Sequence, residues 1–265
     1  MAREVSSITR IGTSEPFELQ VSRGQIAYHK FIHKFGYNPD IADSNETIWS
    51  QGGIYTYPTS ASTMYISSSS TADTSAGTGA RTATVSGLDA NFDEISETVS
   101  LNGQTGVQLN GALNWYRVNR IAVNTAGSGG VNAGVLYVGT EATPTGGVPT
   151  NKYATVAIGD NQTLMCLWTV PRGYTAYLHQ KDVSASSSAG KFAIFTLVAR
   201  PDGGVFNVKD RVTLANNSTS IPYWNPIVFN EKTDIEVRAE ADSGGGTITA
   251  SATLDITYIK NGSDL

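Results

Sequence analysis

Two of the three histidines, His29 and His33, stand four residues apart in the run Tyr-His-Lys-Phe-Ile-His-Lys at 28–34. That spacing puts both imidazoles on one face of a helix, and near one face of a strand, as a zinc site would need. A catalytic zinc site also uses an acidic general base, and the residues between these histidines are Lys, Phe and Ile. The pattern favours histidines that pack or lie at an interface, and we expect no metal.

Acidic residues gather in two short segments. Residues 40–46 form an acidic loop that could hold calcium through irregular oxygen ligands, but it lacks the alternating ligands and central glycine of a helical-hand loop. Residues 93–97 contain three carboxylates, as a glycoside hydrolase would need. Glu94 and Glu97 would lie on opposite faces of a strand, so a solvated turn and surface carboxylates are the plainer interpretation of the two segments.

The single cysteine, Cys166, lies in the apolar run 164–168 with no histidine nearby. This setting predicts a small buried side chain rather than a reactive thiol. One cysteine also excludes a disulfide within the chain. The glycines form no nucleophile elbow, phosphate loop or dinucleotide fingerprint. We therefore expect no enzyme activity, no catalytic residues and no cofactor.

The composition is typical of a β protein with many turns. Only 15% of the residues are charged and 27 are glycine, most of them between candidate strands. The net charge of −5 and the absence of lysine or arginine clusters argue against a nucleic-acid surface. The polar N-terminus and the lack of an apolar run of membrane-span length predict a chain made in a cytoplasm and not inserted in a membrane.

Residues 151–265 are expected to form a β-sandwich or jelly roll. Apolar residues alternate with polar ones over 235–241 and 248–258, the period of a strand with one buried face. The Asp-Ser-Gly-Gly-Gly run between these two strands predicts a hairpin. Short strands at close spacing are typical of a sandwich, and further strands are expected at 154–158, 163–170, 175–184, 191–200 (apolar enough for burial on both faces) and 205–214.

Residues 51–140 are expected to form a second β-rich domain with low-complexity connectors at 67–79 and 125–133. A linker-like stretch of Thr, Pro and Gly at 140–150 predicts the domain boundary. The expected strands lie at 62–68, 81–86, 95–101, 113–124 and 134–139.

Residues 1–50 are expected to be an extended arm that docks the protein on a partner. The segment combines apolar anchors with positive charge on an otherwise acidic chain. Buried aromatic and arginine side chains usually carry interface energy. The alternative is that the segment completes the sheet of the first domain. The candidate docking residues are Phe17, Leu19, Arg23, Ile26, Phe31 and Phe35.

Seven segments, which run from residue 15 to residue 171, are distinctive in combination: 15–26, 35–41, 72–85, 87–89, 97–103, 161–163 and 168–171. Together they resemble a family of virion structural proteins from marine tailed phages of cyanobacterial and related hosts. The resemblance implies a virion protein on the capsid surface or in the tail, and it supplies no catalytic residues.

We therefore expect a virion protein that decorates the capsid exterior as a cement protein, knob or head fibre. A tail, neck or fibre-adaptor component is the first alternative. A host-surface carbohydrate-binding module is the second, with the aromatic pairs at 115–116 and 223–224 as rings that could stack on a sugar. The expected partners are further copies of the chain (a homo-oligomer, either a trimer or a larger ring), the major capsid protein and other virion proteins. A host glycan would be a partner under the carbohydrate-binding alternative.

Overall fold

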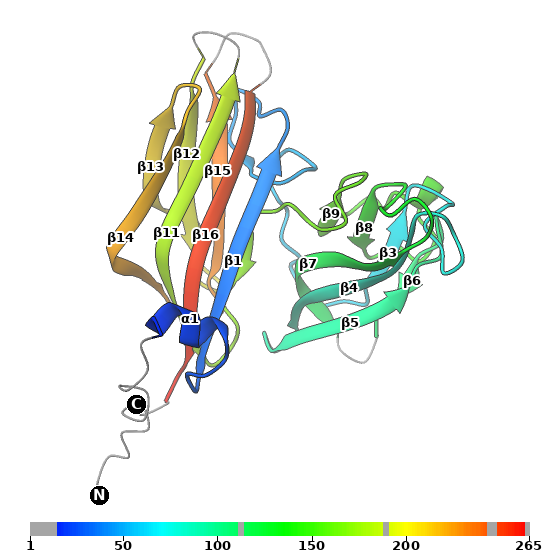
Figure 1. Cartoon of the computed structure of the whole chain (residues 1–265), viewed down its shortest axis with the longest axis horizontal. Coiled ribbons are helices and arrows are strands. Elements are labelled where there is room, and N and C mark those ends of the chain that lie inside the picture. The colour runs from blue at the N-terminus through cyan, green and yellow to red at the C-terminus, as the bar shows by residue number, and fades with distance from the viewer. Residues whose placement is uncertain (1–14, 111–113, 188–190, 243–247, 263–265) are drawn as a thin grey trace, which may run out of the picture.

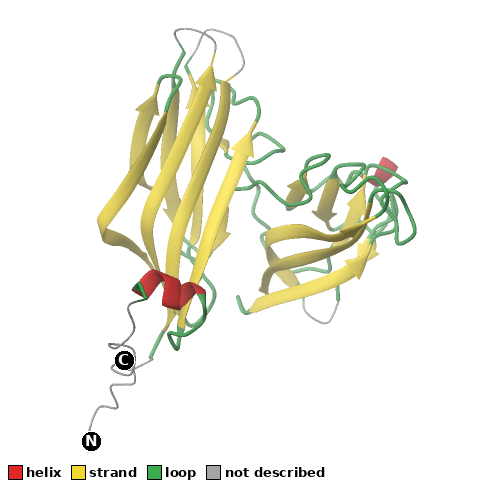
Figure 2. Cartoon of the chain, viewed as in Figure 1, coloured by secondary structure: helices red, strands yellow, loops and turns green. Residues whose placement is uncertain are grey.

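The computed structural model describes residues 15–110, 114–187, 191–242 and 248–262. It is nearly all β-structure, arranged as two lobes (Figure 1, Figure 2). The α-helix α1 (Phe17–Ser22) lies across one end of the larger lobe. Over the described ranges, no helix has the length and apolar character that crossing a membrane requires. The all-β fold class expected from the sequence is confirmed.

The larger lobe is a sandwich of two antiparallel sheets that share one apolar core. One sheet has the order β1-β16-β11-β14, and the facing sheet has the order β10-β15-β12-β13. Eight strands divided in this way between two sheets form a jelly roll, as expected. The strands are β1 (His29–Asn38), β10 (Leu167–Thr169), β11 (Tyr174–Ser187), β12 (Ala193–Arg200), β13 (Asn207–Leu214), β14 (Ser218–Phe229), β15 (Asp234–Ala241) and β16 (Ile248–Lys260).

The prediction that β15 and β16 form a hairpin is wrong. Strand β16 does alternate between buried and half-buried residues. However, β16 pairs with β1 and β11, whereas β15 pairs with β10 and β12 in the facing sheet. Both strands turn an apolar face to the same core from opposite sides, and that arrangement needs the same alternation as a hairpin. Residues 243–247, which carry the predicted turn, lie outside the described residues.

The prediction of an extended N-terminal arm is corrected by the structure, because residues 29–38 form strand β1. It runs antiparallel to β16 over ten residue pairs, from His29 opposite Ile259 to Asn38 opposite Ala250. The segment therefore completes a sheet, but that of the sandwich rather than that of the first domain. Without β1, the long apolar strand β16 would be an open sheet edge, which folded proteins avoid. Residues 1–14 lie outside the described part.

The smaller lobe is inserted within one strand of the sandwich. Strands β2 (Glu46–Thr47) and β10 both pair with β15, and they lie end to end along it. The backbone of Ile48 bonds to Val237 and to Cys166, and Cys166 also bonds to Val237. β2 and β10 are thus two halves of one strand, cut where residues 49–165 enter and leave.

This insertion moves the domain boundary away from 140–150. Strand β9 (Ala154–Val156) still pairs with β8 (Leu136–Gly139) in the smaller lobe, and the chain returns to the sandwich only at Cys166. The Thr/Pro/Gly stretch is a loop of the inserted domain and holds the short 3-10 helix η2 (Thr145–Gly147). Turn-forming residues mark a loop, and they do not distinguish a loop within a domain from a linker.

The inserted domain has its own apolar core between two small sheets, with the orders β6-β3-β8-β9 and β5-β4-β7. The five strands expected in this part of the chain are confirmed in position. The remaining strands are β3 (Tyr65–Ser68), β4 (Ala80–Asp89), β5 (Glu94–Ser100), β6 (Val107–Gln108) and β7 (Trp115–Ala126).

One buried carboxylate organises the loops of the inserted domain. Asp73 is fully buried and accepts hydrogen bonds from the backbone N–H groups of Ala80 (2.7 Å), Ala133 (2.8 Å) and Gly134 (2.8 Å). The hydroxyl of Ser68 donates to the same carboxylate over 2.6 Å. The low-complexity connectors at 67–79 and 125–133 are thereby tied to each other.

Gly36 allows β1 to pass the point where the sandwich strand is cut. A Cβ atom at this position would lie 2.3 Å from the backbone nitrogen of Cys166 and 2.3 Å from the backbone oxygen of Ile48. Because these atoms belong to backbone, no side-chain rotation would relieve the clash. Glycine is therefore required for the three segments to meet.

Candidate interaction surface and domain junction

An apolar surface, which we call the α1 surface, lies where helix α1 packs on the outer side of β1. Val21 points inward and is buried, whereas Phe17 and Leu19 are 52% and 47% exposed. Phe31 of β1 is 43% exposed and lines a cavity of about 300 Å³ together with Phe17. Exposed aromatic side chains of this size, grouped on one face, are typical of a protein-protein contact.

Four of the predicted docking residues are exposed and two are half-buried. Phe17 and Phe31 line the cavity of the α1 surface, and Leu19 is exposed on the same helix. Arg23 is exposed at the end of α1 and pairs with Glu15. Ile26 is half-buried, and so is Phe35, which lines a second cavity between β1 and the inserted domain. Docking by these residues stays a prediction.

The two histidines at 29 and 33 lie along one strand and bind different partners. His29 Nδ1 lies 2.9 Å from the main-chain oxygen of Ala27, and His33 Nδ1 lies 2.6 Å from Asp255 Oδ1. Four residues of strand separate them by about 13 Å, too far to share one ion. In the described part of the chain, no three His, Cys, Asp or Glu side chains come together as a metal site would require.

The other sequence candidates are also dispersed. Asp93 pairs with Arg172, while Glu94 pairs with Lys30 and accepts a hydrogen bond from a tyrosine. Glu97 accepts a hydrogen bond from a backbone N–H, so each carboxylate of 93–97 has a separate partner. The acidic loop contributes Glu46, which accepts a hydrogen bond from Asn38, while Asp40, Asp43 and Asn45 are exposed.

Cys166 is buried as expected, and burial raises the pKa of its thiol to about 12. At neutral pH the side chain is therefore an uncharged thiol.

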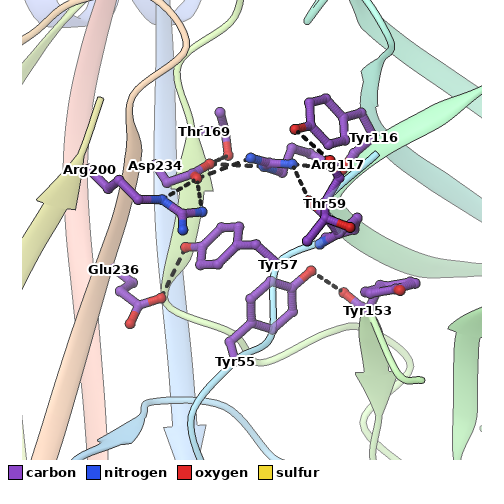
Figure 3. A network of polar contacts seen from close by, with 11 residues as sticks. Tyr55, Tyr57, Thr59, Tyr116, Arg117, Tyr153, Thr169, Arg200, Asp234 and Glu236 are labelled. Atoms are coloured by element: carbon purple, nitrogen blue, oxygen red, sulfur yellow. Dashed lines mark hydrogen bonds and ion pairs between the residues drawn. The ribbon is translucent and has the colours of Figure 1, made fainter. Parts of the chain in front are cut away.

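The contact between the two lobes is built around the carboxylate of Asp234, at the start of β15 (Figure 3). Arg117 of β7 donates two hydrogen bonds to it, from Nε over 2.9 Å and from Nη2 over 3.1 Å. Arg200 of β12 donates from Nη2 over 2.6 Å, and the Thr169 hydroxyl donates over 2.6 Å. Arg117 comes from the inserted domain and the other three residues from the sandwich. This bidentate buried pair fixes the two domains in one orientation.

Aromatic rings cover both guanidinium groups at this junction. The Arg117 guanidinium lies 4.2 Å from the centre of the Tyr116 ring, and that of Arg200 lies 4.7 Å from the centre of the Tyr57 ring. The Tyr57 hydroxyl donates to Glu236 over 3.0 Å (Figure 3). Such stacking adds attraction where water is excluded.

Burial acts on three titratable groups of the junction, and their partners decide how far each pKa moves. Burial favours the neutral form of Arg117, but its hydrogen bonds and ion pair with Asp234 outweigh burial and leave its pKa raised. Burial raises the pKa of the Glu236 carboxyl, against the opposing effect of Arg238. Burial also raises the pKa of Tyr57. The junction is a fixed structural contact, and its groups are engaged with one another.

Sequence reasoning missed this junction because Arg117 and Asp234 are far apart along the chain. No signal in either strand singled them out, because β7 also carries Arg120 and β15 also carries Glu236, Arg238 and Glu240.

A tryptophan projects from the opposite edge of the sandwich. Trp224 is 93% exposed, and it lies in a bulge of β14 where residues 223–226 have no partner on β11. The neighbouring Tyr223 holds the bulge by donating to Asp210, which also pairs with the buried Lys181 over 2.7 Å. Of the two predicted aromatic pairs, this one exposes a ring, whereas Trp115 is fully buried in the core of the inserted domain.

No protein-family model matches the sequence, and no curated protein matches it. Among solved structures, the chain is similar to that of infectious bursal disease virus Gx strain, at 13% identity and a TM-score of 0.29, covering 89% of this chain and 73% of that one. The structure of the Gt strain is 11% identical with a TM-score of 0.22, covering 94% and 79%. The VP2 subviral particle of the same virus is 12% identical with a TM-score of 0.23, covering 90% and 74%. Likenesses at these TM-scores are too weak to assign a function.

Proposed function

We propose that this chain is a structural protein of a phage particle and that it decorates the capsid exterior through the α1 surface. The resemblance of its seven segments to phage virion proteins supports the proposal that the chain belongs to a phage particle. The observation that carries the docking role is the pair of exposed phenylalanines, Phe17 and Phe31, that line one cavity, with Leu19 exposed on the same helix. The fixed junction at Asp234 would hold the inserted domain in a constant position on the particle.

The partner proposed for the α1 surface is the shell protein of the capsid. Phe17, Leu19 and Phe31 are each about half-exposed, so burying the rest of each side chain stabilises a contact by about 1 kcal/mol per residue before the costs of association. Many copies on a symmetric lattice would add further contacts between copies of this chain. A tail or neck component would use the same surface at much lower copy number, about six or twelve per particle for a ring.

The test compares two variants on purified particles. Phe17→Ser combined with Phe31→Ser should abolish attachment, while Trp224→Ser, an exposed aromatic change on another part of the sandwich, should leave it intact. The copy number of the attached protein is read from stained gels against the major shell protein. Hundreds of copies support decoration. Attachment of the double variant at normal copy number would overturn the docking role, and a count near six or twelve would replace decoration by a tail position.

A second candidate function, binding of a host-surface glycan, is favoured by Trp224. A ring that is 93% exposed can stack on the apolar face of a sugar. A shallow groove, lined by hydroxyl groups and the Asp182 carboxylate, lies where β14, β11 and β16 run side by side. Binding of the protein to host cells should then be lost in Trp224→Ser and kept in Val228→Ser, the matched change of an exposed apolar residue on the same strand. Equal binding by both variants would exclude this function.

A further inference from the structure

A cavity of about 300 Å³ lies between the sandwich and the inserted domain, at a place distinct from the Asp234 junction. Strand β1 forms one wall, and strands β4, β5 and β7 of the inserted domain face it (Figure 1). The polar groups that line it include Lys34, Asn119, Arg120 and Glu94. The cavity is large enough for several waters or one small ligand.

Lys34 reaches into this cavity as a buried charge without an acidic partner. Its side chain is 6% exposed, and its ammonium group donates to the main-chain oxygen of Asn119. Among the described residues, no carboxylate pairs with it. The neighbouring Cys166 is a neutral thiol, so it supplies no compensating charge. Burial, together with the nearby Arg120, lowers the pKa of Lys34 to about 7.

A second cation lines the same cavity from the opposite domain. The guanidinium of Arg120 lies 5.8 Å from the centre of the Phe35 ring and donates to the neutral side chain of Gln162. The carboxylate that lines the cavity, Glu94, is already bonded to Lys30 and, over 2.9 Å, to the hydroxyl of Tyr258. His33 is likewise paired, with Asp255. Two cations therefore line the cavity, and the one described carboxylate that lines it with them is already paired.

The side-chain oxygen of Asn119 is the third unmet group. It is buried, and it has no hydrogen-bond partner. A buried acceptor without a donor costs about 1–3 kcal/mol, so a native structure normally supplies one. A ligand for this cavity would combine negative charge with at least one O–H group.

We propose that the cavity binds a phosphate group, bridging the two domains. Its charged oxygens would accept hydrogen bonds from Lys34 and Arg120, and its hydroxyl would donate to the Asn119 side-chain oxygen. Each charge-assisted hydrogen bond of this kind is stronger than a neutral one. The site differs from the proposed docking and glycan surfaces in both residues and ligand. No covalent chemistry is involved.

The test is calorimetric titration of the full chain with inorganic phosphate at pH 6.5 and constant ionic strength. The wild-type protein should bind one phosphate saturably. Lys34→Met and Arg120→Gln should each weaken binding at least tenfold, because each removes one of two charged contacts. Lys209→Met, which removes one exposed lysine from β13, should bind as the wild type does. Absence of saturable binding to the wild type, or undiminished binding by Lys34→Met and Arg120→Gln, would overturn the site.

Two further measurements keep the result decisive. Sulfate has the same shape but no proton to donate to Asn119, so it should bind several-fold more weakly than phosphate, and equal binding would overturn the role assigned to that oxygen. Lys34→Met should melt no lower than the wild type without phosphate, since it removes an uncompensated buried charge. If that variant fails to fold, Arg120→Gln decides alone, because Arg120 is exposed and its replacement disturbs no core.

Discussion

The sandwich and the inserted domain are both β-structures, but they are stabilised in different ways. The sandwich has strands of up to fourteen residues in β11 and thirteen in β16, and their apolar faces meet in one continuous core. In the inserted domain, the sheet β6-β3-β8-β9 consists of strands of only two to four residues with long loops between them, and the buried carboxylate of Asp73 ties those loops together. Where strands are long, regular pairing satisfies the backbone. Where they are short, a buried polar side chain has to satisfy it.

Asp73→Ala is expected to produce the largest effect and to separate the two domains. It leaves the backbone donors of Ala80, Ala133 and Gly134 without an acceptor, at about 1–3 kcal/mol each, for a total of about 5 kcal/mol. Hydrogen exchange followed by mass spectrometry should then show fast exchange in β4 and β7 but continued protection in β11 and β12. Asp43→Ala, an exposed acidic change, is the control. Equal loss of protection in both domains would show that the two cores are not independent.

Arg117→Met tests the ion pair with Asp234 that joins the inserted domain to the sandwich. Removing one partner of a buried ion pair leaves the Asp234 carboxylate with fewer donors, and we expect a loss of about 4 kcal/mol in the free energy of unfolding. Chemical denaturation should show one transition in the wild type and two in the variant, as the domains uncouple. Arg172→Met, which breaks the exposed pair with Asp93, should cost less than about 1 kcal/mol. A single unshifted transition in Arg117→Met would contradict the role of the junction.

Gly36→Ala tests the close approach of β1 to Ile48 and Cys166, where the sandwich strand is interrupted by the inserted domain. The added methyl group would meet backbone atoms of Cys166 and Ile48, so β1 or the cut strand must shift, at about 3 kcal/mol. The melting temperature should fall, with the sandwich strands losing protection first. Gly24→Ala serves as a contrast, because nothing lies within 4 Å of a Cβ atom there, although its positive φ of 68° adds some strain. A larger loss at Gly24 than at Gly36 would contradict the close approach.

The change of stability with pH should be smaller than the effects of these three substitutions, and it should come from Lys34. Its pKa is lowered to about 7 in the folded protein, against 10.5 for an ordinary lysine, so the unfolded state binds more protons between these values. Stability then rises with pH from 7 upward, as the cost of the buried charge disappears. The advantage of Lys34→Met over the wild type should shrink by about 2.7 kcal/mol between pH 6 and pH 9 in phosphate-free buffer, since one pKa unit corresponds to about 1.4 kcal/mol.

Groups facing Lys34 need to be held constant in that comparison. They are Arg120, Cys166, His33, Glu94 and Tyr258, and they are the same in both proteins. Denaturation at several pH values gives the difference directly. A difference that does not change with pH would mean that Lys34 titrates as an exposed lysine does.

The sequence predicted where strands lie along the chain better than it predicted which strands pair. Alternation of apolar residues identified β15 and β16, but it could not reveal that these strands lie in opposite sheets, since the side-chain period is the same in either case. Strand β14 escaped notice because Pro222 and Pro226 are unusual within a strand. Both prolines lie on an edge strand, where their missing N–H groups do no harm.

Long-range polar contacts were the least predictable part. The connector at 67–79 resembles a disordered linker in composition, yet it contains Asp73, whose partners come from as far away as Gly134. Arg117 and Asp234 are joined only by folding of both domains. On the α1 surface, the apolar residues of 17–31 were identifiable, but which of them are exposed depends on how α1 lies on the sheet.

Pairing of β1 with β16 has a consequence for the order of events during synthesis. Strand β1 emerges from the ribosome early, and its partner β16 is made about 200 residues later. At 5–20 residues per second, β1 waits roughly 10–40 s with its backbone N–H and C=O groups unpaired. The inserted domain is complete well before then and can fold first, between the two halves of its host strand. The nascent chain therefore carries a finished domain beside an unfinished one, and protection of β1 from premature association depends on the cell until the last strand arrives.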